Sequence, residues 1–284
     1  IASAENPLTA RVFVNRVWAQ HFGKPLVPTP SDFGLRSEAP SNPELLDYLT
    51  DWFLKSGWDV RALHRLILSS ATYQSISVAP PTSKRPPSPK EAKELYALFL
   101  RRRLTAEEIR DAFLTVSGEI DVTPGEAHPF PPESGWSFTQ HSPFADEYPT
   151  MKRSVYLLQK RNRKARYFAL FDGADPNTSS PIRDNTTVPT QALYFMNDGF
   201  VHARAEKFAE KILSASSTPQ ERIQFAYRQA YGRTPSRLEI QEGERFLMDY
   251  AQSLKEIPPQ NRLTSAWQAY ARVLLSSNEF LYID

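Results

Sequence analysis

Apolar residues recur every three or four positions along much of the chain, which is the spacing of an amphipathic helix. In the clearest case Asn42 precedes Pro43, and Gly57 ends a pattern with one apolar face: Leu45, Leu46, Leu49, Trp52 and Phe53. Similar patterns predict helices over residues 8–22, 59–70, 105–116, 189–214, 218–231, 235–254 and 260–277. The sequence therefore predicts a mainly α, compact multi-helix domain of about eight helices around one core.

Polar residues at the starts of these segments support the assignment. Asn6 precedes a proline before the first segment, Asp59 precedes the third, and Thr105-Ala-Glu-Glu108 is a capping box. The residues Arg153–Leu158 form the one credible strand. We therefore expect at most a small β element near 153–158.

Two segments interrupt the helical pattern. Residues 79–90 are rich in proline and predict an exposed loop or linker. Residues 118–150 contain proline, glycine and aromatic residues without a regular period, and a loop of that length is usually functional or disordered. We expect one helical domain over residues 1–284, with a division into lobes 1–78 and 91–284 as the alternative.

Composition narrows the class of protein. The 284 residues are 40% hydrophobic and 23% charged, as in ordinary globular proteins. Lys and Arg number 34 against 32 Asp and Glu, a balance that gives no argument for nucleic acid or for anionic membranes. No apolar run is long enough for a membrane span, and the first residues do not resemble a signal peptide. Because the initiator Met is missing, we expect that the chain was cut from a longer protein.

Several kinds of chemistry find no support in the sequence. There is no cysteine, which excludes disulfides, thiol nucleophiles and thiolate metal sites. The sequence contains no phosphate-binding loop, dinucleotide fingerprint or Gly-x-Ser-x-Gly motif. The five histidines are His21, His64, His128, His141 and His202. No two of them are three or four residues apart, the spacing with which one helix face could bind a metal ion.

The basic run from Lys160 to Arg166 is the main concentration of positive charge, and it includes Arg161 and Arg163. Such runs are usually solvated faces, and we expect no nucleic acid as partner. A sulfated or acidic polysaccharide would match these charges. So would internal pairing with the Asp residues that follow in the sequence.

The aromatic segment from Phe130 to Tyr148 combines Trp136 with Glu133 and Asp146. Aromatic faces stack on sugar rings, and carboxylates bind sugar hydroxyls or perform glycosidic chemistry. Packing of this segment onto the helices is the alternative explanation.

The stretch from Asp172 to Gln191 is the most polar part of the chain. Asp172, Asp175 and Asn177 could supply oxygen ligands to Ca²⁺, but their spacing is not that of an EF-hand, so we expect no metal. The same residues favour Asx turns. Thr187 or Thr190 could cap the helix that begins near Pro189, and Arg183 could fix the loop through carboxylates or carbonyls.

Many short motifs together resemble one known family. They are Asn6–Trp18, His21–Gly23, Thr29–Gly34, Asn42–Asp47, Leu63–Ile67, Ser70–Tyr73, Arg102–Ala112, Arg153–Tyr156, Asp175–Ser180, Thr186–Leu193, Asn197 and Ser276–Leu281. They resemble the planctomycete-specific C-terminal domain called the domain of unknown function 1553 family.

This resemblance implies a C-terminal domain of a large bacterial protein that lies outside the cytoplasm, in the periplasm or at the cell surface. It also implies an upstream cytochrome-c-like domain that holds haem, and no cofactor is expected in the present chain. The family supplies no catalytic residues.

We therefore expect a binding or scaffold module for polysaccharide, or for the partner domains of a cytochrome-containing surface protein. The expected binding surface comprises Asp172, Asp175, Asn177, Arg183, Asp184, Arg161, Arg163 and Trp136. One alternative is a glycan-acting hydrolase with its acid and base among Asp172, Asp175, Glu133 and Asp146. A second alternative is an electron-transfer docking module, which would present an apolar patch with a polar rim.

Overall fold

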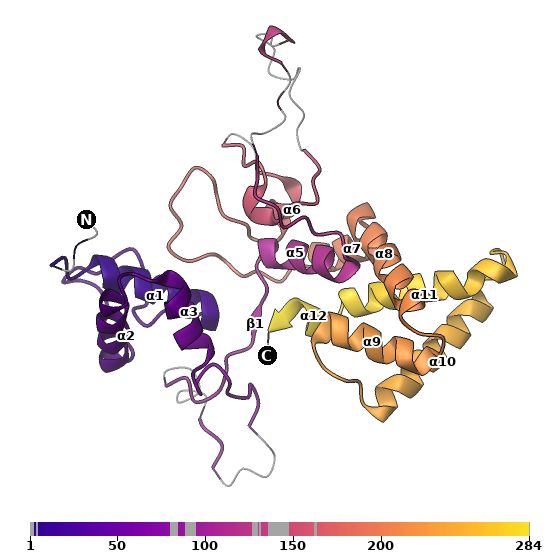
Figure 1. The fold of residues 1–284 in the computed structure, drawn as a ribbon, viewed down its shortest axis with the longest axis horizontal. Coiled ribbons are helices and arrows are strands. Elements are labelled where there is room, and N and C mark those ends of the chain that lie inside the picture. Colours follow the sequence, from indigo (N-terminus) through magenta and orange to yellow (C-terminus); the bar gives the residue numbers. More distant parts are fainter. Residues whose placement is uncertain are drawn as a thin grey trace. The chain divides into compact units, whose positions relative to one another are not determined.

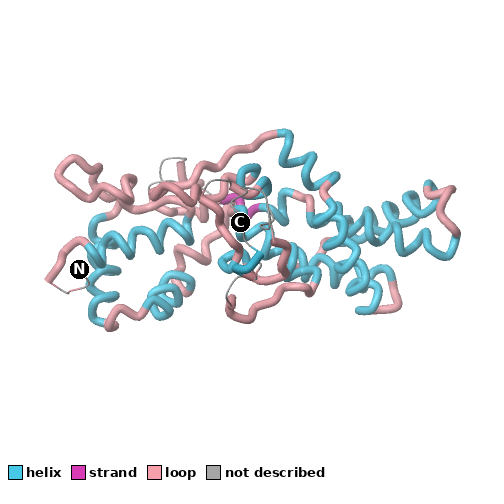
Figure 2. Tube along the Cα trace, turned by 90° about the horizontal axis from the view of Figure 1, so that it is seen from above, coloured by secondary structure: helices cyan, strands magenta, loops and turns pink. Residues whose placement is uncertain are grey.

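The computed structural model describes residues 3, 5–79, 85–88, 95–126, 130, 132–135, 148–161 and 164–283. Helices and loops make up nearly all of this part, with one short pair of strands (Figure 2). The prediction of a mainly α fold is confirmed. The chain divides into two compact units, residues 1–102 with 283–284 and residues 103–282. The division does not fall in the proline-rich segment, and a single folding domain stays a prediction.

The described residues of the first unit include the helices α1 (Thr9–Phe22), α2 (Pro43–Lys55) and α3 (Val60–Leu68) (Figure 1). Their apolar faces pack into one core that includes Trp18, Phe22, Leu46, Phe53 and Leu63. The predicted caps of α2 and α3 are present, because Asn42 accepts a hydrogen bond from the N–H of Leu45 and Asp59 accepts one from Ala62. The first helix begins at Thr9, slightly later than predicted, and the Asn6 side chain accepts hydrogen bonds from the N–H groups of Leu8 and Thr9.

The second unit has a larger helical core. Its long helices are α5 (Ala106–Ser117), α8 (Gly199–Ala215), α9 (Pro219–Tyr231), α10 (Arg237–Ser253) and α11 (Pro259–Leu275). Figure 1 shows α9, α10 and α11 close together, and α8 packs against both α11 and α5. The predicted capping box at Thr105 and Glu108 starts α5. The described residues of this unit also form shorter helices: α6 (Arg166–Leu170), α7 (Pro189–Asn197), α12 (Asn278–Leu281) and the 3-10 turn η1 (Glu133–Gly135).

The structure corrects one predicted helix. The apolar pattern over residues 189–214 predicted a continuous helix, whereas α7 ends at Asn197 and α8 begins at Gly199. Asp198 has an extended backbone, and its carboxylate accepts a hydrogen bond from the N–H of Phe200 at 2.8 Å. Both helices bury apolar residues, so the periodicity continues across a break that an N-cap residue makes.

The predicted strand at Arg153–Leu158 is also corrected. These residues form a 3-10 turn, η2 (Ser154–Tyr156), next to an isolated bridge between Asp121 and Lys152. The carboxylate of Asp111 on α5 accepts bonds from the N–H and hydroxyl of Ser154 at 2.8 and 2.7 Å, which favours the turn. Among the described residues, the strands are β1 (Arg102–Arg103) and β2 (Tyr282–Ile283), which pair with each other.

Within the described residues, no helix has the length and apolar character that a membrane crossing requires.

Candidate functional site

The polar stretch that begins at Asp172 is closed by a buried ion pair. Asp172 has a positive φ of 57°, and its carboxylate accepts a hydrogen bond from Nη2 of Arg103 at 2.8 Å. The same carboxylate accepts bonds from the N–H and the hydroxyl of Thr186, both at 2.8 Å. The side chains of Arg103 and Asp172 are only 7% and 14% exposed. We call this group the clasp, because it joins the two ends of the loop.

The electrostatics of the clasp favour an ionised Asp172. Burial alone raises the pKa of its carboxyl group. Hydrogen bonds from Thr186 and from the guanidinium of Arg103 oppose this effect, and the pKa of Asp172 lies below its usual value. A carboxylate engaged in this way stabilises the loop.

Gln191 extends the clasp into α7. Its Nε2 donates to the carbonyl oxygens of Leu170 and Thr186 at 2.9 and 3.1 Å. Its Oε1 accepts from Nη1 of Arg103 at 3.2 Å and from the N–H of Val188 at 3.4 Å. The predicted caps Thr187 and Thr190 are wrong, because Val188 is the N-cap residue and the Gln191 side chain satisfies its N–H. The long Gln side chain reaches back from inside the helix, which a search for hydroxyl caps does not reveal.

Three of the predicted surface residues meet in a second contact. Asp175 Oδ1 accepts a hydrogen bond from the N–H of Asn177 at 2.8 Å, which is the predicted Asx turn. The Nδ2 of Asn177 donates to the carbonyl oxygen of Arg161, so the loop braces the basic run. These three residues are exposed.

The other predicted residues lie elsewhere. Arg183 pairs with Glu107 on α5, and Asp184 is exposed. Arg163 and Trp136, together with Asp146 of the hydrolase hypothesis, lie outside the described residues. Glu133 is exposed in η1. The proposed binding surface therefore stays a prediction.

Metal binding has no geometric support in the part of the chain that the structure describes. No three His, Cys, Asp or Glu side chains there converge closely enough to hold a metal ion. Asp172, the first of the Ca²⁺ candidates, directs its carboxylate to Arg103 and Thr186.

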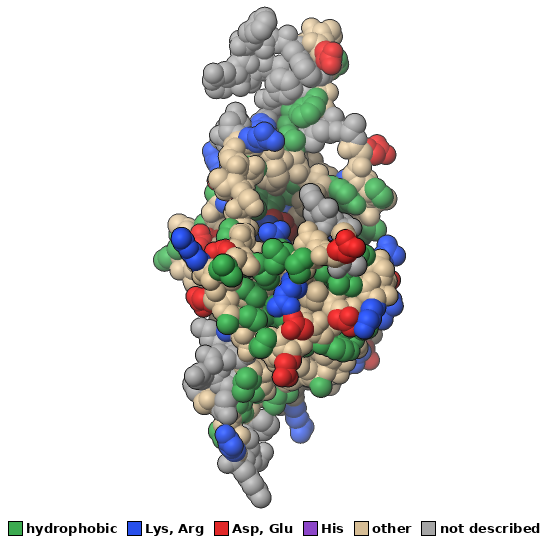
Figure 3. All heavy atoms as spheres, turned by 90° about the vertical axis from the view of Figure 1, so that its left-hand side faces the viewer, with side chains coloured by type: hydrophobic (Ala, Val, Ile, Leu, Met, Phe, Trp, Pro, Cys, Tyr) green, Lys and Arg blue, Asp and Glu red, His purple; other side chains and the backbone are tan. Residues whose placement is uncertain are grey.

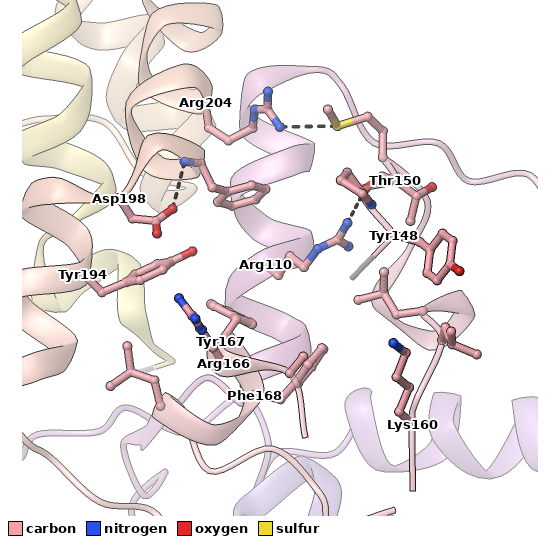
Figure 4. Close-up of a pocket in the computed structure, with 17 residues that line it drawn as sticks. Arg110, Tyr148, Thr150, Lys160, Arg166, Tyr167, Phe168, Tyr194, Asp198 and Arg204 are labelled. Atoms are coloured by element: carbon pink, nitrogen blue, oxygen red, sulfur yellow. Dashed lines mark hydrogen bonds between the residues drawn. The ribbon is translucent and has the colours of Figure 1, made fainter. Parts of the chain in front are cut away.

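A cavity of about 650 Å³ lies in the second unit, beside the basic run. Its wall comes from α5, α6, α7, the start of α8 and the segment 148–160. Aromatic side chains make up much of it: Tyr148, Tyr167, Phe168, Tyr194 and Phe200. Figure 4 shows Tyr194 and Tyr148 on opposite sides, with Arg110 between them. Tyr167 is held in place by its hydroxyl, which donates to the carbonyl oxygen of Ala106 at 2.7 Å. Burial raises the pKa of Tyr167, which keeps this hydroxyl protonated.

Positive charge dominates the described lining. Four cations, Arg110, Lys160, Arg166 and Arg204, face one carboxylate, that of Asp198. Asp198 already caps α8. On the face of the molecule shown in Figure 3, by contrast, basic and acidic side chains are interspersed. The pocket is therefore a local concentration of positive charge in a chain of nearly balanced charge.

Arg110 and Arg204 are buried parts of the wall, with exposed fractions of 9% and 7%. Arg110 donates to the carbonyl oxygens of Thr150 and Lys152 and to the hydroxyl of Ser154. Desolvation by burial lowers its pKa, with only a partial opposing effect from the carboxylate of Asp111 at 3.6 Å. A buried cation whose main acceptors are neutral gains from an anion beside it.

Two residues of the basic run that were not among the predicted binding residues line the pocket. Lys160 and Arg166 line the cavity, whereas the predicted Arg161 is outside the lining. Figure 4 shows Lys160 and Arg166 approaching from opposite sides. The aromatic segment contributes Tyr148.

Sequence reasoning missed Arg110 and Arg204, although both carry a recognisable signal. Arg110 lies between Ile109 and Phe113, and Arg204 lies at helical spacing from Val201 and Phe208. Each is thus a charged residue on an apolar helix stripe, a position that is rare without a partner.

The fold and this site define a mainly helical protein with a cationic, aromatic-lined pocket in its second unit. The chain belongs to the family described as Protein of unknown function (DUF1553), whose model matches residues 1–247. The resemblance drawn from the motifs is thereby confirmed. Neither the curated proteins nor the solved structures contain a match to the chain.

Proposed function

We propose that this chain is a binding module for an anionic polysaccharide, which it holds in the pocket of the second unit. The observation that carries the proposal is the lining, in which four cations and five aromatic side chains surround about 650 Å³. Sugar rings present apolar faces that stack on aromatic rings, while acidic substituents pair with Arg and Lys. A cavity of this volume is within the usual range for ligand sites.

The carboxylates support binding over glycan hydrolysis. A glycosidase needs two carboxyl groups that flank the scissile bond. In the described lining the carboxylate of Asp198 accepts a hydrogen bond from the N–H of Phe200. Asp172 is not part of this lining, and its carboxylate is engaged by the clasp. The lining therefore offers fixed charge and stacking surfaces.

The setting of the module follows from the family resemblance. We propose that it works outside the cytoplasm, in the same polypeptide as an upstream haem-bearing domain, and that it holds no cofactor of its own. Cell fractionation of the natural producer tests this part, and a purely cytoplasmic protein would contradict it.

The binding proposal is tested with the double variant Lys160→Met, Arg166→Met. Each charge-assisted contact is worth about 1.5–3 kcal/mol, so the variant should bind an acidic polysaccharide at least about tenfold more weakly in calorimetric titrations. The matched control is Arg161→Met, which removes a cation of the same run that does not line the pocket. An equal loss in the control, or equally tight binding of a neutral glycan, would exclude the pocket as the site.

A further inference from the structure

We propose that the contact between His21 and His64 is an acid-sensitive joint of the first unit, which holds α1 to α3 at neutral pH and opens when both rings become protonated. These residues belong to the first unit and lie outside the pocket of the proposed function. A hydrogen bond between two ring nitrogens needs one nitrogen without a proton, and this requirement makes the contact sensitive to acid.

The two histidines form a direct polar link between α1 and α3, helices that each pack against α2. His21 lies in the last turn of α1, and His64 lies in the middle of α3. Nε2 of His21 is 2.7 Å from Nδ1 of His64, and both residues are half-buried. The end of α1 is therefore held to α3 by a bond that depends on protonation.

The number of protons on the pair decides whether this bond exists. In the neutral pair one ring donates its N–H and the other accepts with its bare nitrogen. One extra proton can bind to a nitrogen that faces away from the bond, so the bond survives it. A second extra proton places an N–H on both facing nitrogens, and the repulsion of two cations replaces the bond.

The surroundings of His21 add to its resistance to protonation. Burial, the charge of His64 and the charge of Arg102 all lower the pKa of His21 below its usual value of 6.5. The ring of Tyr73 packs edge-on against that of His21, with centroids 5.7 Å apart, and a tyrosine carries no charge at acid or neutral pH. All the influences on this pKa thus act in the same direction.

The carboxylates of the neighbouring helices have other partners. On α2, Asp47 pairs with Arg11 and Asp51 pairs with Lys55. On α3, Asp59 caps the start of the helix. Among the described residues, the charges that shift the pKa of His21 are the cations of the preceding paragraph.

The stability of the joint is therefore linked to pH. In the unfolded chain both histidines titrate near about pH 6.5. In the folded unit the second extra proton binds only at lower pH, so below about pH 6.5 the unfolded state binds more protons and stability falls with the pH. A deficit of one proton changes the opening equilibrium about tenfold per pH unit.

The first test is a titration of the histidine ring signals of the full chain by nuclear magnetic resonance. We expect the pair to take up its protons in two separate steps, the second at least about one pH unit below the usual value. Two independent titrations near about pH 6.5 would overturn the proposal.

The second test measures opening by hydrogen exchange in the full chain. After correction for the intrinsic exchange rate, the protection of amides in α1 and α3 should fall between about pH 6.5 and about pH 5, by up to about tenfold per unit. The amides of α9 in the second unit are the internal reference. If α1 and α3 were no more sensitive to acid than α9, the joint would not exist.

The variant His21→Gln separates the bond from the titration. Its side-chain N–H can donate to a neutral Nδ1 of His64, and its carbonyl oxygen can accept from a protonated one, so a hydrogen bond is possible in both states. The variant should keep the protection of α1 and α3 at neutral pH and lose its dependence on acid.

The matched control is His202→Gln, which makes the same change on α8, outside the pair. It should leave the acid sensitivity of α1 and α3 as it is in the unmodified chain. If His21→Gln retained this sensitivity, the pair would not be its cause. The two measurements on the unmodified chain do not depend on either variant.

Discussion

The clasp loop and the pocket both concentrate polar residues in the second unit, yet they use them in opposite ways. In the loop, Asp172 binds Arg103 and Thr186, so the charged groups satisfy one another. In the pocket, the buried Arg110 donates to neutral acceptors, while the buried Arg204 pairs with Glu119 at 2.7 Å and donates to the sulfur of Met151. The comparison teaches that a high density of polar residues does not by itself indicate a binding site. A charge that its neighbours leave incompletely balanced is the better indicator.

The largest effect should come from breaking the clasp. Asp172→Ala leaves Arg103, with a side chain only 7% exposed, without its carboxylate. Removal of one partner of a buried pair costs about 3–5 kcal/mol, so the free energy of unfolding should fall by that amount in urea titrations. Affinity of the folded variant for polysaccharide should not change.

The matched control for this variant is Asp184→Ala, which removes the same charge from an exposed position of the same loop. Its stability should stay within about 0.5 kcal/mol of the unmodified chain. If Asp172→Ala instead remained stable and lost ligand binding, the roles that we assign to loop and pocket would be reversed.

Acid should remove part of the same stabilisation. The pKa of Asp172 is lowered in the folded state, so its contribution is present above the unfolded value of about 3.9 and is lost as the pH falls through the folded value. The difference in unfolding free energy between the unmodified chain and Asp172→Asn should be constant from about pH 7 to about pH 5 and should shrink below about pH 4. A difference that grows in acid would show that the clasp is not an ion pair in the folded state.

Salt should have a smaller effect, weakening ligand binding at the pocket more than the stability contributed by the clasp. Raising the ionic strength from about 0.01 to about 0.15 M shortens the screening length from about 30 to about 8 Å. Polysaccharide binding should weaken several-fold over this range because the ligand brings its charge from solvent. The stability difference caused by Asp172→Ala should change little, since buried pairs are screened less. Salt-independent binding would exclude charge as the basis of recognition.

The smallest effect should come from removing the hydrogen bond that links the clasp loop to the basic run beside the pocket. Asn177→Ala removes the bond from Nδ2 to the carbonyl oxygen of Arg161, which is exposed. We expect a loss of about 1 kcal/mol or less in unfolding free energy and a modest loss of affinity, because the segment that carries Lys160 becomes less ordered. The control is Asn197→Ala, which removes an exposed hydrogen bond from the side-chain amide to the carbonyl oxygen of Leu193 on α7. It should leave affinity for the polysaccharide unchanged.

Local signals made much of the fold predictable. The caps at Asn42, Asp59 and Thr105 each accept a hydrogen bond from the N–H group three residues further along the chain, so the local sequence contains the interaction. The break at Asp198 was missed because apolar periodicity continues through it, and the strand at Arg153–Leu158 was wrong because Asp111, far away in the sequence, stabilises a turn.

The site was less predictable than the fold for a related reason. The sequence directed attention to Arg161 and Arg163 of the basic run, whereas Lys160 and Arg166 line the pocket. Arg110 and Arg204 line one cavity because α5 packs against α8, and this tertiary contact is not visible in the local sequence. The loop attracted the prediction through its composition, and composition does not reveal which partner each group finds.

The clasp also makes the loop a suitable place for an inserted label. The hydrogen bonds between Asp172 and Thr186 hold the ends of the loop together. Residues 177–190, which include most of the loop and the first residues after it, are exposed. Doubling the length of a flexible loop costs only about 0.6 kcal/mol, and exposed tips tolerate insertions best. A fluorophore or affinity tag placed between Ser179 and Ser180 would extend into solvent while the anchored ends keep their spacing, which would give the protein a built-in handle for imaging and purification.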